Sequence, residues 1–343
     1  MDKIIALTIK NVGISMNKSF LKTVSASLLS LMYCSVANAD LQRFYEESTD
    51  SWDCGYKNSL GEVVVPTGLF EACGEFSDGL AYVGKIKKGY DEEGNLSYKN
   101  LQGFIDNKGR LVIPVEHEAN DTGMDTDYKS FSEGLVAVYR NGKYGYMNKQ
   151  RELIIPYQYQ SAEAFQDGLA VVSLKEKYGA IDQSGKTIVP FKFNFLHSYS
   201  DGLAQYTESN HWNNGSQYGF VDTNGNISIK AKWDRACNFS EGLAAVRVGD
   251  YETGKWGVID KSGNFIVEPK YDAPNIQTWS DAYYDDCYYK EGKINMYQYT
   301  DASKPHESSI TRYTLDNQGN VISETFYANW DAVIKKYEFQ SCR

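Results

Sequence analysis

One short peptide recurs along this chain of 343 residues. Each copy reads aromatic residue, any residue, Asp or Glu, Gly, Leu, and then a small or branched apolar residue. The five copies begin at Phe76, Phe131, Phe165, Tyr199 and Phe239, and their glycines are spaced by 55, 34, 34 and 40 positions. A fixed period of about 20 to 50 residues is typical of tandem-repeat architectures. The sequence therefore predicts an array of similar units.

Two further blocks follow each hexapeptide. The second has a Gly, two apolar residues and an Asp or Asn, as in Gly103-Phe-Ile-Asp106. The third is an apolar pair that ends in proline, as in Ile113-Pro114, eleven residues after that Gly. Short runs rich in β-branched and aromatic residues, separated by Gly-containing turns, predict about three antiparallel strands in each unit. No apolar stripe with helical spacing accompanies them.

The fold class expected from this pattern is all-β. Tandem three-stranded β-meander repeats would stack into an open, twisted array or solenoid. The alternative is a ring of six or seven blades, as in a β-propeller, because the number of units suits a ring. A period of 34 residues is short for a propeller blade of about 40 to 45 residues, which favours the open stack.

The first 39 residues have the features of an export signal. A basic segment begins at Met16, an apolar segment spans Thr23 to Val36, and Ala37-Asn-Ala39 is a small-residue cleavage site. We expect translation to start at Met16 and cleavage to follow Ala39. The mature protein is then periplasmic or secreted, with no stable membrane insertion.

The repeats divide the remaining chain into three segments. Residues 40–75 form an N-terminal half repeat or cap, and residues 76–272 contain five full repeats. Residues 273–343 hold a degenerate C-terminal repeat and a tail, and Trp279-Ser-Asp-Ala-Tyr283 is assigned as the hexapeptide of that repeat. Atypical end copies are expected because an ordinary copy would leave its stacking face bare.

The blocks resemble the bacterial WG-repeat family, also called KWG repeats. The unit that begins at Phe239 matches it best; it is the sixth when the N-terminal half unit is counted as the first. Its three blocks are Phe239-Ser-Glu-Gly-Leu-Ala, Lys255-Trp-Gly-Val-Ile-Asp260 and Val267-Glu-Pro-Lys-Tyr-Asp272. In the other units the tryptophan is replaced, by Tyr144, Tyr178, Tyr218 or Gln102. The resemblance covers residues 52 to 330. It implies an all-β repeat protein of a family in which a biochemical activity is generally not established.

Charge narrows the classes of partner. The full chain has a formal net charge of −10, and removing residues 1–39 takes away four Lys and one Asp. Binding to nucleic acid or to anionic lipid depends on Lys and Arg neutralising phosphates, so both are poor partners for so acidic a chain. A basic protein partner fits better.

Five cysteines remain in the mature chain, and in an oxidising compartment they tend to pair. Cys54 and Cys73 flank the N-terminal half unit, whereas Cys237 and Cys287 flank the last full unit. We expect these two local disulfides to stabilise the ends of the array, with Cys342 left over. Other connectivities remain open, since four cysteines allow three. Zinc binding is disfavoured because the chain has no Cys-x-x-Cys spacing.

No catalytic motif is present in the sequence. The four histidines, His117, His197, His211 and His306, lie in no metal-binding spacing, and no nucleophile elbow or phosphate-binding loop occurs. The Asp or Glu of the hexapeptide recurs once per unit, which favours a structural role because an active site is needed only once. We expect neither an enzyme nor a cofactor or metal site.

Insertions that interrupt the repeats are the candidate binding sites. Lys85 to Gln102 is a charged insertion whose hairpin turn contains Asp91, Glu92 and Glu93. An acid-rich linker at 115–128 could alternatively bind calcium, but it lacks the spacing of a calcium loop. The insertion at 207–216 holds His211 and Trp212, and Trp212 could anchor a protein, stack on a sugar or pack on its own loop.

These observations give a function class. The leading hypothesis is an exported, non-enzymatic protein-binding module, and a specific form of it is an inhibitor or immunity protein for a secreted toxin. The alternative is a cell-wall or carbohydrate-binding protein, for which the 27 tyrosines and Trp212 would offer stacking surfaces.

Overall fold

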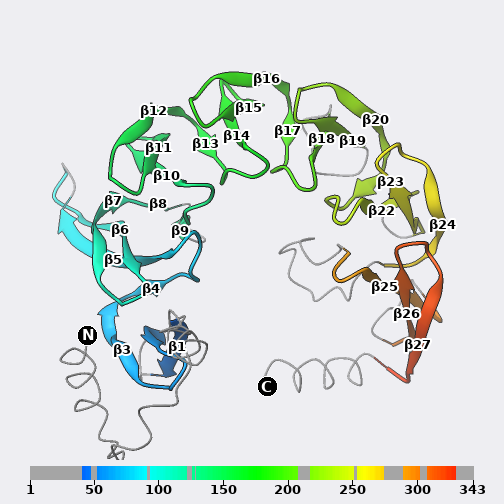
Figure 1. Ribbon diagram of the computed structural model, residues 1–343, viewed down its shortest axis with the longest axis horizontal. Coiled ribbons are helices and arrows are strands. Elements are labelled where there is room, and N and C mark those ends of the chain that lie inside the picture. The colour runs from blue at the N-terminus through cyan, green and yellow to red at the C-terminus, as the bar shows by residue number, and fades with distance from the viewer. Residues whose placement is uncertain are drawn as a thin grey trace, which may run out of the picture.

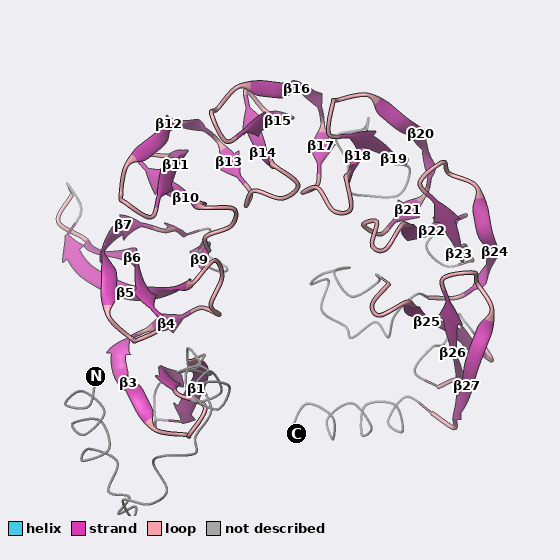
Figure 2. Cartoon of the chain, viewed as in Figure 1, coloured by secondary structure: helices cyan, strands magenta, loops and turns pink. Residues whose placement is uncertain are grey.

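The computed structural model describes residues 41–47, 52–90, 93–121, 126–127, 129–207, 217–250, 253–273, 289–301 and 307–329. All regular elements in these ranges are β-strands (Figure 2). The strands follow an open arc that runs from β1 to β27 without closing into a ring (Figure 1). The expected all-β stack of tandem meanders is therefore confirmed.

The described strands divide into seven units along the arc. The first three units contain β1 (Gln42–Glu47), β2 (Trp52–Lys57) and β3 (Val63–Phe70); β4 (Ala72–Cys73), β5 (Leu80–Tyr90), β6 (Leu96–Asp106) and β7 (Leu111–Glu118); and β10 (Leu135–Arg140), β11 (Lys143–Asn148) and β12 (Leu153–Tyr159). A small hairpin of β8 (Asn120–Asp121) and β9 (Thr126–Asp127) lies between units two and three.

The last four units continue the same order of strands. They contain β13 (Ser161–Ala162), β14 (Leu169–Leu174), β15 (Lys177–Asp182) and β16 (Thr187–Phe193); β17 (Phe195–Leu196), β18 (Leu203–Thr207), β19 (Tyr218–Asp222) and β20 (Ile227–Trp233); β21 (Arg235–Ala236), β22 (Leu243–Val248), β23 (Lys255–Asp260) and β24 (Phe265–Tyr271); and β25 (Lys293–Tyr299), β26 (Ile310–Asp316) and β27 (Val321–Tyr327).

Each unit is an antiparallel meander whose last strand lies on the outside of the arc (Figure 1). Three long strands match the prediction, and units two, four, five and six add a two-residue strand at the inner edge of the sheet. The first unit, of which the sequence showed only half, gains a third strand because β1 pairs with β2.

Glycine in the second block is required by a close approach of two strands. Beside Gly257, the partner strand β24 changes register, and a Cβ at Gly257 would lie 2.5 Å from the main-chain oxygen of Val267. In units one to five the equivalent carbonyl oxygen would lie 2.5 to 2.7 Å from such a Cβ. Only glycine permits this contact without displacing the outer strand.

The hydrophobic core lies between neighbouring units rather than inside one sheet. The aromatic residue of each hexapeptide enters this space, and Phe131, Phe165, Tyr199 and Phe239 are fully buried. Four such residues contact the aromatic ring that follows the glycine in the preceding unit, as Phe131 does with Phe104 at 4.8 Å between ring centres. Each core is thus formed by side chains from two neighbouring units.

Where the preceding unit offers a smaller side chain, a tyrosine fills the space. Ala180 and Val258 replace the aromatic ring in units four and six. Tyr199 of the next hexapeptide packs with Ala180, and Tyr289, at the start of unit seven, packs with Val258. The Tyr199 hydroxyl donates a hydrogen bond to the main-chain oxygen of Asp222 at 3.1 Å. Tyrosine, which is larger than phenylalanine, therefore fills the volume that the smaller side chain of the preceding unit leaves at the interface.

Units two and three are joined more tightly than the others. Tyr139 on β10 pairs with Glu118 on β7, so the two units form one seven-stranded sheet. The longest strands of the molecule, β5 and β6, belong to this sheet and extend outward from the arc as a hairpin (Figure 1). This joined sheet is a continuous base for that hairpin.

Candidate functional site

The hexapeptides form turns that lie on the inner side of the arc (Figure 2). In the first copy, Ser77 and Leu80 exchange two main-chain hydrogen bonds of 2.9 and 3.0 Å, and the two central residues have positive φ, 57° at Asp78 and 81° at Gly79. Two residues with positive φ define a type I′ turn. The turn therefore comprises the second to fifth residues of the hexapeptide, and the last of these, Leu80, begins β5.

The acidic residue of each turn binds the turn of the following unit. Asp78 Oδ2 accepts a hydrogen bond from the main-chain N–H of Gly134 at 2.6 Å. The same contact recurs along the arc, from Gly168 to Glu133, Gly202 to Asp167, Gly242 to Asp201 and Gly292 to Glu241. We call this series the turn ladder.

The residue before the acid strengthens the turn ladder in four of its steps. The Ser132 hydroxyl donates to the main-chain oxygen of Phe165, the aromatic residue of the next turn, at 2.6 Å. Ser77, Ser200 and Ser240 make the equivalent contact. Gln166 occupies this position in unit four. These polar residues have the structural role that their recurrence predicted, but they join neighbouring units.

A second set of carboxylates shapes the outer hairpin loops. Asp182 Oδ1 accepts hydrogen bonds from the main-chain N–H groups of Ser184 at 2.9 Å and Lys186 at 3.0 Å, and from the Ser184 hydroxyl. The Ser184 hydroxyl and these N–H groups hold the pKa of Asp182 below its usual value. Asn148 makes the same pair of main-chain contacts in unit three, which indicates a structural role for this position.

The seventh unit has a turn of this kind that the sequence analysis did not identify. Tyr289-Lys-Glu-Gly-Lys293 forms it, with positive φ at Glu291 and Gly292 and a bridge between Lys290 and Lys293. Lys293 stands where the other copies have Leu, which hid the match. The segment assigned from sequence, Trp279 to Tyr283, lies outside the described residues.

The charged insertion at 85–102 is the hairpin of β5 and β6, as expected. Its outer part runs from the pair Lys85 and Leu101 to the pair Tyr90 and Leu96. Directly opposed residues of an antiparallel pair lie on the same face of a sheet. One face of the hairpin therefore carries Ile86, Tyr90, Leu96 and Tyr98, all of them exposed, around Lys88. We call this the hairpin face.

Charged residues surround the hairpin face. Lys85, Lys87 and Lys99 lie on the opposite face, where Lys99 forms an ion pair with Glu118 at 2.7 Å. Glu93 is exposed in the turn that follows β5. Asp91 and Glu92, which the sequence analysis named beside Glu93, lie outside the described residues. The stem of this hairpin is thus basic in an otherwise acidic chain.

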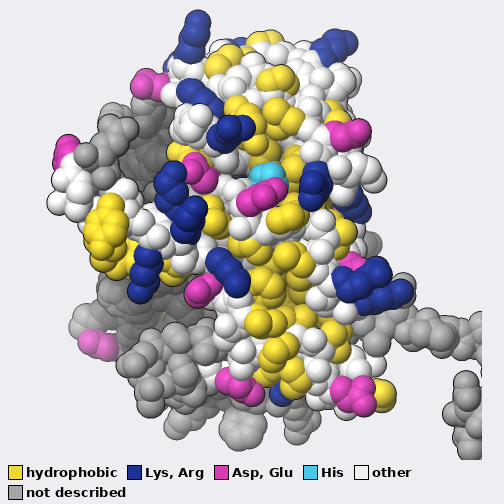
Figure 3. Space-filling model, turned by 90° about the vertical axis from the view of Figure 1, so that its left-hand side faces the viewer, with side chains coloured by type: hydrophobic (Ala, Val, Ile, Leu, Met, Phe, Trp, Pro, Cys, Tyr) yellow, Lys and Arg dark blue, Asp and Glu magenta, His cyan; other side chains and the backbone are white. Residues whose placement is uncertain are grey.

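A second apolar surface lies on the outer strands. Each of several outer strands begins with aliphatic side chains that face solvent, and Figure 3 shows hydrophobic side chains gathered into a band along this face of the arc. We call it the outer band, and its exposed residues are Val63, Val64, Leu111, Val112, Leu153, Ile154, Ile227, Ile266, Val321 and Ile322.

The outer band was not predicted from the sequence, because its runs of aliphatic residues have the pattern expected of buried strands. In Leu153-Ile-Ile155 three aliphatic residues are consecutive, but Ile155 is buried whereas Leu153 and Ile154 are not. The register shift of β12 against β11 breaks the alternation of faces. A run of three aliphatic residues just before the proline is the signal that could have revealed it.

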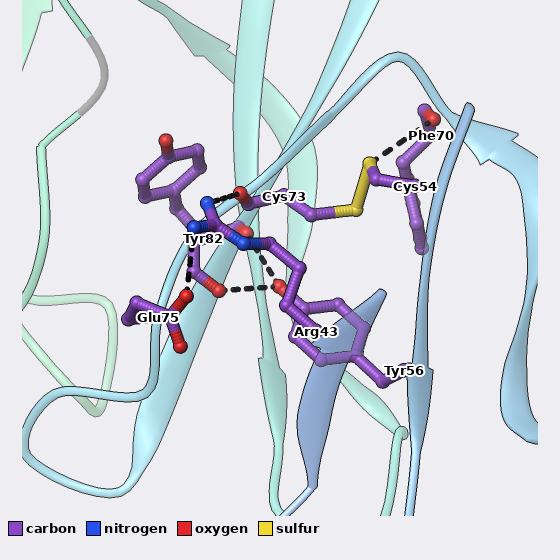
Figure 4. The surroundings of a disulfide bond; sticks show 8 residues. Arg43, Cys54, Tyr56, Phe70, Cys73, Glu75 and Tyr82 are labelled. Atoms are coloured by element: carbon purple, nitrogen blue, oxygen red, sulfur yellow. Dashed lines mark hydrogen bonds and ion pairs between the residues drawn. A yellow bond between two sulfur atoms is a disulfide. The ribbon is translucent and has the colours of Figure 1, made fainter. Parts of the chain in front are cut away.

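One predicted disulfide is confirmed and lies at the junction of units one and two (Figure 4). Cys54 on β2 is bonded to Cys73 on β4, with an S–S distance of 2.05 Å. Arg43 supports the junction by donating to the main-chain oxygen of Cys73 at 2.9 Å and pairing with Glu75 at 2.7 Å. The cap is therefore attached both covalently and by polar contacts.

The remaining sequence candidates are only partly described. Cys237 is disulfide-bonded, and its expected partner Cys287 lies outside the described residues. His211 and Trp212 lie outside them too. In the part of the chain that the structure describes, no group of His, Cys, Asp or Glu has a metal-binding arrangement, and no helix could span a membrane.

Comparison with solved structures shows similarity of fold alone. A crystal structure of the eukaryotic initiation factor shares 13% identity, with a TM-score of 0.55 over 85% of this chain and 75% of that one. Hsv2p from Kluyveromyces lactis shares 11% identity, with a TM-score of 0.42 over 83% of this chain and 94% of that one. No curated protein matches the sequence significantly.

A family model described as "WG containing repeat" matches the sequence five times, at residues 55–85, 144–178, 178–212, 218–251 and 256–284. Each of these segments includes the Gly of a second block. The matches follow the units of the arc, and the turn ladder and the close-approach glycines give the repeated residues a physical role. The chain belongs to the WG-repeat family.

Proposed function

We propose that this protein is a non-enzymatic scaffold that binds another protein along the outer band. The observation that carries the proposal is the gathering of exposed aliphatic residues on successive outer strands (Figure 3). Soluble monomers rarely expose contiguous apolar patches larger than a few hundred Å², and larger ones mark interaction sites. An arc that carries such residues in six of its seven described units presents an extended surface to a partner.

The arrangement of carboxylates supports binding rather than catalysis. Those of the turn ladder accept hydrogen bonds from the next unit, and those of the outer loops accept bonds from their own turns. In the outer loops, hydrogen bonds from the Ser184 hydroxyl and from main-chain N–H groups lower the pKa of Asp182. These carboxylates are suited to stabilising the turns and the contacts between units, and less to exchanging protons with a substrate.

Charge and export indicate the kind of partner. The chain has a net charge of −10, so electrostatic attraction favours a basic protein and accelerates its association. With the predicted signal peptide, the encounter would take place in the periplasm or outside the cell. A specific form of this function is inhibition of, or immunity to, a secreted toxin.

Affinity capture with variants of the outer band tests the proposal. Val112→Ser combined with Ile154→Ser places a polar side chain within the outer band on two neighbouring outer strands. Val248→Ser is the matched control, because Val248 and Val112 are both 44% exposed and Val248 lies on an inner strand of unit six. We expect a protein recovered from periplasmic extract by the wild type and by the control to be lost with the double variant.

Two results would contradict the proposal. One is recovery of the same protein at the same yield with the double variant, provided that all three proteins unfold at similar temperatures. The other is recovery of peptidoglycan fragments without any protein. That result would favour the alternative of a cell-wall binder.

A further inference from the structure

The outer strand of unit seven, β27, differs from the outer strands of the other units. In units one to six the outer strand changes register beside the glycine of the second block. Most of these strands also contain a proline, such as Pro269 in β24. Prolines and bulges keep a free strand edge from pairing with another chain. In unit seven Tyr313 stands at the glycine position, and β27 contains no proline.

As a result, β27 is a regular edge strand. It follows β26 without a register shift over five pairs, from Ser323 to Tyr327. Within the described ranges β26 is the one strand that neighbours it, so its other edge faces no described strand. This edge lies on the outside of the arc at its C-terminal end (Figure 1). A regular edge strand without proline is a template for pairing with another chain.

The hydrogen-bonding pattern identifies the main-chain groups at this edge. The N–H of Thr300 donates to the main-chain oxygen of Ser309 at 3.0 Å, where β25 meets β26. Bonded and non-bonded residues alternate along an antiparallel pair. Counting from this bond, Thr325 is a residue of β27 that bonds to β26. Its neighbours Glu324 and Phe326 therefore direct their N–H and C=O groups away from β26.

Two copies of β27 can pair through these groups about a twofold axis at Thr325. In this antiparallel register Glu324 of each copy lies opposite Phe326 of the other, and both residues exchange main-chain hydrogen bonds. Thr325 lies opposite Thr325 of the second copy, and Thr–Thr pairs stabilise antiparallel strands. No charged side chain lies directly opposite another charged one. The edge is thus complementary to itself, as a twofold dimer requires.

We propose that two copies of this chain associate by antiparallel pairing of β27. The pairing joins the three-stranded sheets of the two copies into one sheet of six strands. It also places Phe326, which is 67% exposed, against the second copy. Pairing of one short strand buries less than a standard interface of roughly 1,600 Å², so the dimer is in equilibrium with the monomer. It uses the edge of β27 and not the apolar face of the outer band.

Two substitutions at one position test the role of the main chain. Glu324→Pro removes an outward N–H group, which an edge strand tolerates, so unit seven should stay folded while association is lost. Glu324→Gln keeps the N–H group and removes the repulsion between the two Glu324 carboxylates, which lie on the same face of the joined sheet. It should lower the dimer dissociation constant about twofold. Sedimentation equilibrium from micromolar to near-millimolar concentrations measures both effects against the wild type.

Cross-linking tests the register. The two Thr325 residues form a non-hydrogen-bonded pair with Cα atoms about 4.5 Å apart, which is within the range of a disulfide. Thr325→Cys, with Cys342→Ser to remove the cysteine expected to be left over, should form a covalent dimer on mild oxidation. Ser323→Cys in the same background is the matched control. Its two copies would lie four residue steps apart, roughly 13 Å, and should not cross-link.

Three outcomes would overturn the inference. A wild type that stays monomeric at every concentration excludes the dimer. Association that persists in a folded Glu324→Pro protein places the contact elsewhere. Equal cross-linking of the two cysteine variants, or none of either, excludes the register. Circular dichroism of each variant separates these results from misfolding, and the substitutions lie outside units two and three, where the outer band is tested.

The dimer and the outer-band partner can therefore fail separately.

Discussion

Two neighbouring positions of the repeat are governed by different constraints. The glycine of the second block is present in all of units one to six, whereas the position before it varies among Trp256, three tyrosines, Gln102 and Cys54. Glycine cannot be replaced because the outer strand's carbonyl oxygen occupies the space of a side chain. The preceding residue only has to match the last residue of the outer strand, as Trp256 does with Tyr271.

Gly257→Ala should therefore destabilise the protein more than an ordinary glycine substitution. Its Cβ would lie 2.5 Å from the Val267 oxygen, and relieving that overlap should cost about 1 to 3 kcal/mol of unfolding free energy. Urea unfolding followed by circular dichroism measures the loss. Gly89→Ala on β5 is the control, because a Cβ there meets no atom within 4 Å. Equal effects of the two substitutions would refute the close-approach explanation.

At the scale of elements, the turn ladder converts a local turn into a contact between units. The sequence predicted that the acidic residues have a structural role, but it could not identify their partners. Asp78 and Gly134 are 56 positions apart, and no local pattern links them. Their contact exists only because successive units stack with the same offset, which is a property of packing.

The ladder predicts opposite effects at two equivalent positions. Ser132→Ala removes the hydrogen bond to Phe165 and should lower the unfolding free energy by about 1 kcal/mol. Gln166→Ser introduces the missing hydroxyl opposite the main-chain oxygen of Tyr199 and should raise it by about 0.5 kcal/mol. Chemical denaturation measures both, with Ser228→Ala on the exposed side of β20 as a control of small effect. A destabilising Gln166→Ser would show that this contact cannot be transferred between units.

Several elements could be predicted from sequence and others could not. The outer hairpins were predictable because Asp106 and Gly109 form a local signal. The hairpin of β5 and β6 was predictable because turn residues lie in the middle of the charged insertion at 85–102. The two-residue strands such as β13 are too short to show a pattern. The choice between arc and ring depends on a small rotation between units, which no single unit encodes.

At the scale of the whole molecule, each unit contacts its neighbours and the ends are the weak points. A stack of this kind is stabilised by its units and by the interfaces between them. Among the described units, unit one has an interface with unit two alone, and the disulfide between Cys54 and Cys73 lies at that interface. The cap should accordingly depend on the disulfide more than any internal unit does.

Replacing both cysteines tests this dependence. Cys54→Ser with Cys73→Ser opens a loop with a sequence separation of 19 and should cost about 3 kcal/mol of stability. Hydrogen exchange should show faster exchange of amides in β1 to β3, with β14 to β16 unchanged. Reduction of the wild type should have the same effect on β1 to β3, but it also breaks the disulfide of Cys237. Uniformly faster exchange in every unit would instead show that the arc unfolds as one block.

The open end of the arc has a consequence for the gene as well as for the protein. A closed ring admits only a fixed number of blades, because adding one changes every angle. An arc joined by the contact from acid to glycine has no such condition, since a duplicated unit meets the same donors and acceptors as the original. Duplication or loss of a whole repeat can therefore change the reach of the molecule without redesigning any interface.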